Sequence, residues 1–555
     1  MTAPRVLFCS NYYPPAFVGG AELIAHAQAR TLAERGWHVA VFAGDPSGRT
    51  ARHALRRDTH EGLCVHRIGL TAADLRPDHL NVVNPTLDGA FAAVLEAERP
   101  DVVHFHNLAG LSVGFIGLAR RRGIRTVLTV HDHWGFCFKN TRLKSETDVC
   151  RDHTRCAECQ PFFVDEARGL LPVRLRGDFV RMQLEQLDAI VSPSEYLAVA
   201  YAAAGFPRER FHIIWNGVDV ARFARIEKTP SDRPRFAFVG HLGRHKGLRT
   251  LLDALALLPT GVAFLLHVVG EGEEQARLAD GVHRLGLGDS VRFHGLVGRE
   301  RIDEVYRETD VLILPSIWPE NHPVTITEAM ASRTAVLASR IGGIPELVAD
   351  GESGDLFTPG DARDLAAKML AFIREPERAR RLGDAGFRRI ADDTLANQVA
   401  RLEAAYGAAA VARPSPGQAV RVFACAGGRI DVACGWAMNA LARQGDPRWR
   451  FVLADWLDDD TLRRALALWV VDPGAGLECV VRGLRLGVPL LVPERATELS
   501  GLATEGRCGL TYRDVFEAIR CLEALAEDTA VRRALGAQGR LLAARAARRG
   551  VELRP

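Results

Sequence analysis

The sequence predicts an α/β fold in which helices cover parallel sheets, repeated over more than one domain. Short apolar runs alternate with helical patterns almost from end to end, and this alternation is typical of strand–helix–strand units. The chain has 555 residues, which at roughly 150 residues per domain is enough for three or four domains. Hydrophobic residues make up 47% of the chain and charged residues 25%, which excludes a disordered or fibrous protein.

The first predicted domain covers residues 1–225. It begins with an apolar run at 5–10 and a helix over about 20–35, and four further runs are interpreted as strands: HVAVFA, DVVHFH, RTVLTV and AIVSPS. The hydrophilic stretch 226–234, with its two prolines, separates this unit from the next one.

The second predicted domain covers residues 233–384, and it contains the expected strands RFAFVG, AFLLHVVG, SVRFHG, DVLILP, AVLAS and GDLF. A helical stretch follows at 385–408, and an Ala/Pro/Ser/Gly-rich linker at 409–417. The third predicted domain, 418–555, has the same order of strand, glycine-containing turn, helix and glycine as the earlier units. We therefore interpret it as a shortened internal repeat.

The charge and the apolar pattern exclude several classes of protein. There are 71 basic and 68 acidic residues, so the chain lacks the basic field that nucleic-acid binding needs. No uninterrupted apolar stretch of about eighteen residues occurs, and the N-terminus lacks the pattern of a signal peptide, so we expect a cytoplasmic protein. Eleven cysteines without an export signal favour free or metal-bound thiols over disulfides.

The most informative segment is PSIWPENHPVTITEAMA, residues 315–331, which carries Glu320 and Glu328. Pro323 fits the first position of a helix, so Glu328 lies inside that helix and Glu320 in the preceding loop. A loop that leads into a helix N-terminus can bind phosphate, and a carboxylate can accept two hydrogen bonds from a vicinal diol. Two solvated glutamates remain the alternative. A glycosidase pair is disfavoured, because eight helical residues rise about 12 Å and glycosidase carboxylates lie roughly 5–9.5 Å apart.

A glycine-bearing turn, GHLGRHKG at 240–247, follows the first strand of the second domain. Arg244 and Lys246 in this turn could neutralise a diphosphate leaving group as its charge develops, although two solvated cations are the simpler interpretation. The segment VVGEGEE resembles a dinucleotide-binding turn, but Gln275 stands where the third glycine of that fingerprint belongs.

Over residues 5–406 the chain resembles the retaining, nucleotide-sugar-dependent group 1 glycosyltransferases of the GT-B fold. The resemblance rests on ordered motifs: YPPAFVGGAE, DVVHFHN, TVHDHW, IVSPSEY, WNGVD, FVGHLGRHKG, VVGEGEE, VRFHGLV, DVLILPSIWPENHPVTITEAM and GGIPELVADGESGDLF. It implies two Rossmann-like domains facing each other across a cleft, with helix 385–408 packed back toward the first domain. It also implies a nucleoside-diphosphate sugar as donor and no cofactor for catalysis.

The same resemblance assigns roles to individual residues. Glu328 would bind the ribose, Glu320 would face the donor sugar, and Lys246 and Arg244 would hold the diphosphate. The implied catalytic residues are His131, Arg244, Lys246 and Glu320. The implied donor-binding residues are Gly19, Gly20, His241, Gly270, Asn321, His322, Pro323, Val324 and Glu328. His241 departs from the family pattern, which commonly has arginine at that position.

Four cysteines, Cys137, Cys150, Cys156 and Cys159, lie in an irregular loop at 137–159. The two-residue spacing of Cys156 and Cys159 suits zinc. A structural zinc and four reduced thiols are both consistent with this pattern.

The arginine-rich segment 168–182 mixes cations with apolar residues, so it could contact the inner membrane surface or simply form a domain surface. Pro172 and Gly177 are expected to interrupt any helix there. In the third domain, Glu478 matches Glu320, but Arg482 stands opposite Glu328, so we expect a degenerate domain that binds no nucleotide sugar.

The sequence therefore predicts a glycosyltransferase that acts on a glycan or lipid-linked acceptor in cell-surface polysaccharide or glycoconjugate biosynthesis. The alternatives are a non-catalytic carbohydrate-binding or assembly scaffold, a sugar phosphorylase and a nucleotide-sugar epimerase. The motifs identify neither the base and sugar of the donor nor the oligomeric state.

Overall fold

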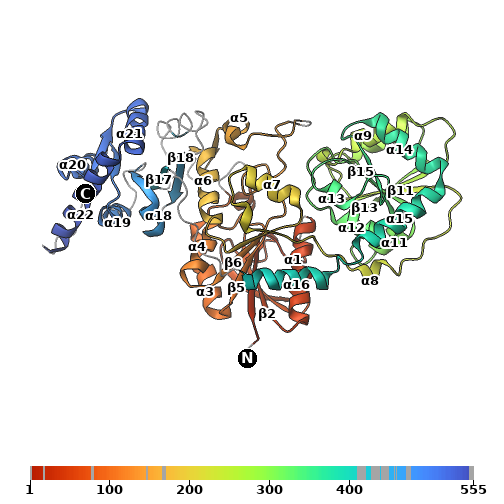
Figure 1. Cartoon of the computed structure of the whole chain (residues 1–555), viewed down its shortest axis with the longest axis horizontal. Helices are drawn as coiled ribbons and strands as arrows, with labels where there is room; N and C mark the ends of the chain where they lie inside the picture. The colour runs from red at the N-terminus through yellow and green to blue at the C-terminus, as the bar shows by residue number, and fades with distance from the viewer. Residues whose placement is uncertain are drawn as a thin grey trace.

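The computed structural model describes residues 3–16, 19–76, 81–145, 148–164, 170–408, 421–426, 449–454, 459–470 and 477–548, together with Met438 and Leu457. Figure 1 shows three α/β units side by side, with the first domain in the middle, the second to its right and the third to its left. Each unit is built on its own largely parallel sheet, so the predicted fold class is confirmed.

The first domain contains an eight-stranded sheet of order β10-β9-β6-β5-β1-β2-β4-β3, parallel except for β3. Its strands are β1 (Arg5–Ser10), β2 (His38–Asp45), β3 (Leu55–His60), β4 (Leu63–Gly69), β5 (Val102–Phe105), β6 (Arg125–Thr129), β9 (Ala189–Ser192) and β10 (Phe211–Ile213). Its helices are α1 (Gly20–Glu34), α2 (Ala72–Leu75), α3 (Asp88–Glu98), α4 (Gly114–Arg121), α5 (Cys156–Cys159), α6 (Val173–Leu184) and α7 (Glu195–Ala203), with 3₁₀ turns η1 (Pro85–Leu87), η2 (His153–Arg155) and η3 (Arg208–Arg210). Strands β7 (Phe162–Val164) and β8 (Leu170–Pro172) form a separate two-stranded antiparallel sheet.

Both faces of this sheet are buried, as the apolar runs predict. In β1, Leu7 and Cys9 belong to one hydrophobic cluster, whereas Val6 and Phe8 belong to another. Because successive side chains of a strand point to opposite faces, every residue of such a strand needs an apolar or paired side chain.

The second domain contains a six-stranded parallel sheet of order β13-β12-β11-β14-β15-β16. Its strands are β11 (Arg235–Val239), β12 (Leu265–Val269), β13 (Val291–Gly295), β14 (Val311–Leu314), β15 (Ala335–Ser339) and β16 (Asp355–Phe357). Its helices are α8 (Val220–Phe223), α9 (Leu248–Ala256), α10 (Gln275–Arg284), α11 (Ile302–Arg307), α12 (Val324–Ala331), α13 (Ile344–Leu347), α14 (Ala362–Arg374) and α15 (Pro376–Ile390), with the turn η4 (Arg244–Lys246).

Helix α16 (Leu395–Ala408) follows the second domain in sequence but packs on the first, beside α1 (Figure 1). Its Glu403 accepts hydrogen bonds from Arg35 and from Trp37, the latter at 2.8 Å. The hydroxyl of Tyr406 lies 2.7 Å from Nδ1 of the buried His104. The chain thus crosses from the first domain to the second and returns.

The third domain has a five-stranded parallel sheet of order β18-β17-β19-β20-β21. Its described elements are β17 (Arg421–Ala426), β18 (Trp449–Ala454), α18 (Asp459–Arg464), β19 (Ala465–Val470), α19 (Leu477–Leu486), β20 (Leu490–Pro493), α20 (Thr497–Glu505), β21 (Gly509–Tyr512), α21 (Val515–Glu527) and α22 (Thr529–Arg548). Strand for strand this is the order β12-β11-β14-β15-β16 of the second domain, with α19 in the place of α12. The turn after β17, on which the repeat hypothesis also rests, lies outside the described residues.

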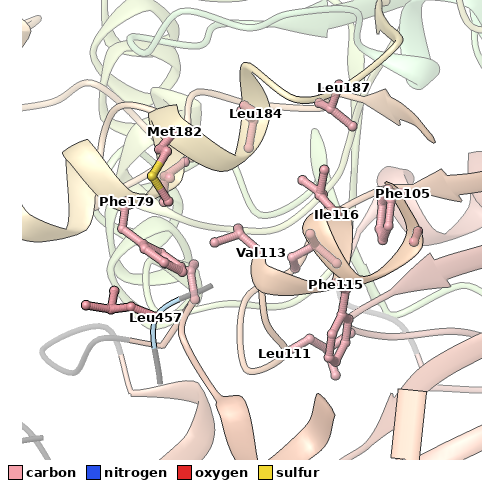
Figure 2. Packing of buried hydrophobic residues seen from close by; sticks show 14 of the residues in the cluster. Phe105, Leu111, Val113, Phe115, Ile116, Phe179, Met182, Leu184, Leu187 and Leu457 are labelled. Carbon is pink, nitrogen blue, oxygen red and sulfur yellow. The ribbon is translucent and has the colours of Figure 1, made fainter. Parts of the chain in front are cut away.

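Segment 168–182 differs from its prediction. Its described part contains α6, which runs through Gly177 without interruption, and Pro172 caps its N-terminus. The helix is buried against the third domain: the backbone N–H of Phe451 donates to Asp178 at 2.8 Å, and Figure 2 shows Phe179 and Met182 near Leu457. Packing outweighs the helix penalty of one glycine. Most of α6 is therefore covered by protein, and contact of the chain with a membrane surface stays a prediction.

Among the helices that the structure describes, none combines the length and the hydropathy needed to cross a membrane.

Candidate active site

Lys246 and Glu320 meet at the carboxyl ends of two paired parallel strands, β11 and β14. The ammonium group of Lys246 donates to Oε1 of Glu320 at 2.7 Å, and the hydroxyl of Ser316 donates to the same oxygen at 2.6 Å. Gly247, at φ +71°, allows this approach, because a Cβ there would lie 1.8 Å from the carbonyl oxygen of Pro315. Ligands of open α/β sheets bind at this edge.

Glu320 is 5% exposed, yet it stays ionised. Burial raises the pKa of its carboxyl, but the adjacent charge of Lys246 and the hydrogen bonds from Lys246 and Ser316 hold that pKa below its ordinary value. The site therefore contains a neutral ion pair in which the ammonium group has further donors for a ligand.

The loop after Glu320 carries buried polar atoms without partners. Within the described part of the chain, Oδ1 of Asn321 and both ring nitrogens of His322 make no hydrogen bond. Burial lowers the pKa of His322 to about 4, so its ring is neutral. Unpaired buried polar groups are rare in native proteins, so these atoms point to a polar ligand.

Two glycines that the sequence did not single out hold this loop in place. A Cβ at Gly342 would lie 2.0 Å from the carbonyl oxygen of Glu320, and one at Gly343 would lie 2.0 Å from that of Asn321. The N–H of Gly343 donates to the carbonyl of Glu320 at 2.7 Å. Pro323 caps α12, one position before the helical site predicted for it, and Val324 is the first helical residue.

Glu328 lies in α12, 1% exposed, as expected for a residue inside this helix. The hydroxyl of Tyr306 donates to its Oε2 at 3.0 Å, and the guanidinium of Arg299 donates to its Oε1. Neither partner was predicted, because an arginine in a loop and a tyrosine in a helix carry no signal until the chain path is known.

His241 and Arg244 lie at the edge of the site, and more than half of each side chain is exposed. Nε2 of His241 lies 3.1 Å from Glu273, and Nε of Arg244 donates to Glu274 at 3.2 Å. Gly270, at φ +130°, brings two backbones together, because a Cβ there would lie 1.9 Å from the carbonyl oxygen of Gly240.

Residues of the first domain contact the loop that follows Glu320 and the start of α12. A Cβ on Gly20 would contact the side chain of Val324 at 3.4 Å, whereas Gly19 faces open space. The side-chain amide of Asn321 donates to the carbonyl of His131 at 2.8 Å. Gly20 and His131 of the first domain therefore lie beside residues 321–324 of the second.

His131 is held by a second histidine. Its Nε2 lies 2.8 Å from Nδ1 of His106, and the two rings are nearly parallel, at 17°. Burial lowers the pKa of His131 to about 4. Burial has the opposite effect on the adjacent carboxyl of Asp132, whose pKa it raises to about 7. The sequence did not indicate this shift, because residue type alone does not report burial.

The loop thiols are not preassembled around a metal position. Among the described residues, no three ligand atoms that include a sulfur of Cys137, Cys150, Cys156 or Cys159 lie within 4.8 Å of one another. The thiols of Cys150 and Cys156 instead donate to the carbonyls of Asp152 and His153. Structural zinc stays a prediction for this loop.

Comparison with known families identifies the class of enzyme. The family described as glycosyl transferases group 1 matches residues 219–389, and glycosyltransferase family 4 matches residues 18–222. Fold and site thus define a glycosyltransferase with the GT-B fold. More particularly, the second domain matches the group 1 family, and the first domain matches family 4.

Individual relatives are consistent with this class. The chain is 26% identical over 410 residues to a glycogen synthase of Mycobacterium tuberculosis, covering 70% of this chain and 91% of that protein. Its fold is similar to that of a sucrose-phosphate synthase from Thermosynechococcus elongatus, with a TM-score of 0.56, 24% identity, and coverage of 73% and 98% of the two chains. It is also similar to Anabaena HepE in complex with UDP, with a TM-score of 0.53, 19% identity, and coverage of 73% and 99%.

Proposed function

We propose that this glycosyltransferase moves a sugar, with retention of its anomeric configuration, from a nucleoside-diphosphate sugar to a glycan or lipid-linked acceptor. The acceptor would belong to the biosynthesis of cell-surface polysaccharide or glycoconjugates on the cytoplasmic side of the membrane. The observation that carries the proposal is the ion pair of Lys246 and Glu320, which lies beside a loop with unpaired polar atoms.

The diphosphate would bind between Lys246 and the N-terminus of α12. An ammonium group has three donors, so Lys246 can keep its bond to Glu320 and still donate to a phosphate oxygen. The N–H groups at the start of α12 favour negative charge, Arg244 adds positive charge at the rim, and the His241 ring can donate a hydrogen bond there. This arrangement stabilises the leaving group as its charge develops.

The ribose would bind to Glu328. A carboxylate offers about four lone-pair positions, and Arg299 and Tyr306 take one on each oxygen. The remaining positions can accept two hydrogen bonds from a vicinal diol. Tyr306 and Arg299 would act by fixing the orientation of that carboxylate.

Retention is supported by the state of Glu320. Its carboxylate is bound by a cation and a hydroxyl, which suits a fixed negative charge beside the developing positive charge of the sugar. We propose that the acceptor hydroxyl attacks from the face that the diphosphate leaves and that a diphosphate oxygen takes up its proton.

The third domain would not bind a donor. Arg482, in α19, donates to Asp459 at 3.1 Å, and Glu478 is exposed at the start of that helix. We propose that this domain is a degenerate repeat that supports the first domain through α6. We do not favour the scaffold alternative, because the first and second domains both match glycosyltransferase families.

The proposal is tested by incubating the protein with UDP-, GDP- and ADP-sugars and measuring nucleotide release, with and without acceptors. The anomeric configuration of the product, read by NMR, tests retention. Phosphate-dependent release would instead indicate a phosphorylase, and isomerisation of the donor without transfer an epimerase.

Glu328→Ala should weaken donor binding at least about tenfold, which is the loss of about 1.4 kcal/mol from two hydrogen bonds. Glu352→Ala, on an exposed turn, is the matched control. Donor binding that is equal in the two variants would refute the site.

A further inference from the structure

A group of metal-ligand side chains lies where β4 of the first sheet begins and α3 ends. Cys64 and His66 are on β4, and Glu98 is the last residue of α3. One ligand atom from each residue lies within 4.8 Å of the other two: the sulfur of Cys64, Nε2 of His66 and a carboxylate oxygen of Glu98. The glycosyltransferase mechanism uses none of them.

The backbone explains how the three side chains converge. Cys64 and His66 are two residues apart on one strand, so they share a face of the sheet. Ile68, two residues further along, belongs to the hydrophobic cluster that also contains Val94 and Leu95 of α3. Cys64 and His66 therefore lie on the same face of β4 as the buried Ile68. Helix α3 covers this face and ends at Glu98, beside the two side chains.

The distances suit a shared ion. The sulfur of Cys64 lies 3.7 Å from Nε2 of His66, and that nitrogen lies 2.8 Å from Oε1 of Glu98. Tetrahedral zinc would place the sulfur and nitrogen about 3.6 Å apart, and the nitrogen and oxygen about 3.4 Å apart. The first distance already fits, and the second needs the carboxylate to move by about half an ångström.

Burial and charge also favour a divalent cation. His66 and Glu98 are 7% and 8% exposed, whereas Cys64 is partly exposed, which leaves an entry path. A thiolate and a carboxylate together neutralise a doubly charged ion. The neighbouring cations act on the ligands rather than on the ion: Nε of Arg57 donates to the sulfur at 3.2 Å, and Nε of Arg5 donates to the carbonyl of Glu98.

We propose that Cys64, His66 and Glu98 bind one zinc ion that ties β4 to the end of α3. Mixed sulfur, nitrogen and oxygen ligands are typical of zinc, and binding releases the protons of the thiol and of Nε2. A water molecule completes the coordination, and His38, whose Nε2 lies 3.1 Å from the second oxygen of Glu98, orients that carboxylate. The site is structural, since it lies away from the donor-binding residues.

The test uses the full chain with Cys156→Ser and Cys159→Ser, so that the loop thiols cannot form a competing site. The protein is purified without metal-affinity steps, stripped with a chelator and titrated with Co²⁺. One equivalent should bind with a near-ultraviolet thiolate-to-cobalt band. Adding Cys64→Ser should abolish the band, and adding Glu98→Gln should weaken binding at least about tenfold.

Zinc content of the same background, purified from zinc-supplemented cells, provides a measurement that does not depend on the Cys64 variant folding. One equivalent supports the proposal, and none overturns it. A cobalt band that survives Cys64→Ser also overturns it, because the thiolate would then come from another residue. Glycosyl transfer is not part of the readout, so failure here is distinct from failure of the proposed function.

Discussion

The side-chain amide of Asn321 donates to the backbone carbonyl of His131 at 2.8 Å, so the loop after Glu320 in the second domain contacts the first domain directly. Because the amide nitrogen is bound, the orientation of Asn321 is fixed and its Oδ1 remains buried without a partner. A ligand that reaches this oxygen must carry a donor group, as a sugar hydroxyl does.

Removing the charge of Lys246 should abolish most turnover. Lys246→Met keeps the length of the side chain but leaves Glu320 as a buried carboxylate without its cation. We expect kcat to fall by about 10²- to 10³-fold, as for the loss of one donor that stabilises a leaving group. Lys368→Met is the control, because its ammonium group lies on the surface 3.9 Å from Asp350. Steady-state assays that give similar kcat values for both variants would contradict the role of Lys246.

His106 should control the tautomer of His131. Nε2 of His106 is buried without a partner, so its hydrogen is better placed on Nδ1, where it donates to His131. His131 then carries its own hydrogen on Nδ1. His106→Phe should lower kcat about tenfold or more at similar donor KM, whereas His106→Asn should retain more activity, because an amide nitrogen can replace Nδ1. Equal kcat values for these two variants would argue against this coupling.

We expect the carboxylate of Glu346, in α13 of the second domain, to hold that domain against the first. It accepts hydrogen bonds from the backbone N–H groups of Glu195 and Tyr196, at 2.8 and 2.6 Å, at the N-terminus of α7. Glu346→Ala should increase the radius of gyration in X-ray scattering and reduce kcat/KM about tenfold, equivalent to about 1.4 kcal/mol. Glu352→Ala should change neither quantity, and an unchanged radius for Glu346→Ala would exclude this function.

Stability should fall as the pH falls from about 6.5 toward 4. Burial lowers the pKa of His104 to about 3 and those of His131 and His322 to about 4, so the unfolded chain takes up protons that the folded chain does not. Each such histidine lowers the free energy of unfolding by about 1.4 kcal/mol for each pH unit of acidification in this window. Asp88 and Asp132 act in the opposite sense, because burial raises their pKa values to about 6 and about 7.

Urea unfolding at pH 7, 6 and 5 measures this balance. The effect of the histidines should exceed that of the two aspartates, so the free energy of unfolding should fall toward pH 5. His322→Leu should make this decrease smaller. An unfolding free energy that rises toward pH 5 would contradict the expectation.

The sequence predicted the sheets and the loop-to-helix arrangement of segment 315–331 because both follow local patterns. The apolar strands, the glycines at 243 and 247 and the segment 315–331 each carry their signal within a few residues. Lys246 and Glu320 were assigned to one donor site through the family resemblance, and their direct ion pair was not predicted.

Long-range contacts could not be predicted in this way. Arg299 reaches Glu328 only through the path of the loop after β13, and Gly342 supports Glu320 only because β15 lies beside β14. Helix α6 was missed because its stability comes from the third domain, which outweighs the local effect of Gly177.

The return of α16 to the first domain has a consequence for synthesis on the ribosome. Val399, Leu402 and Tyr406 cover the same face of the first sheet as Val6 and Phe8, yet about 180 residues separate the end of β10 from the start of α16. At about 5–20 residues per second, the nascent first domain waits roughly ten to forty seconds with only α1 and not α16 on that face. We therefore expect the apolar side chains that α16 later covers to stay exposed to solvent until this helix leaves the exit tunnel.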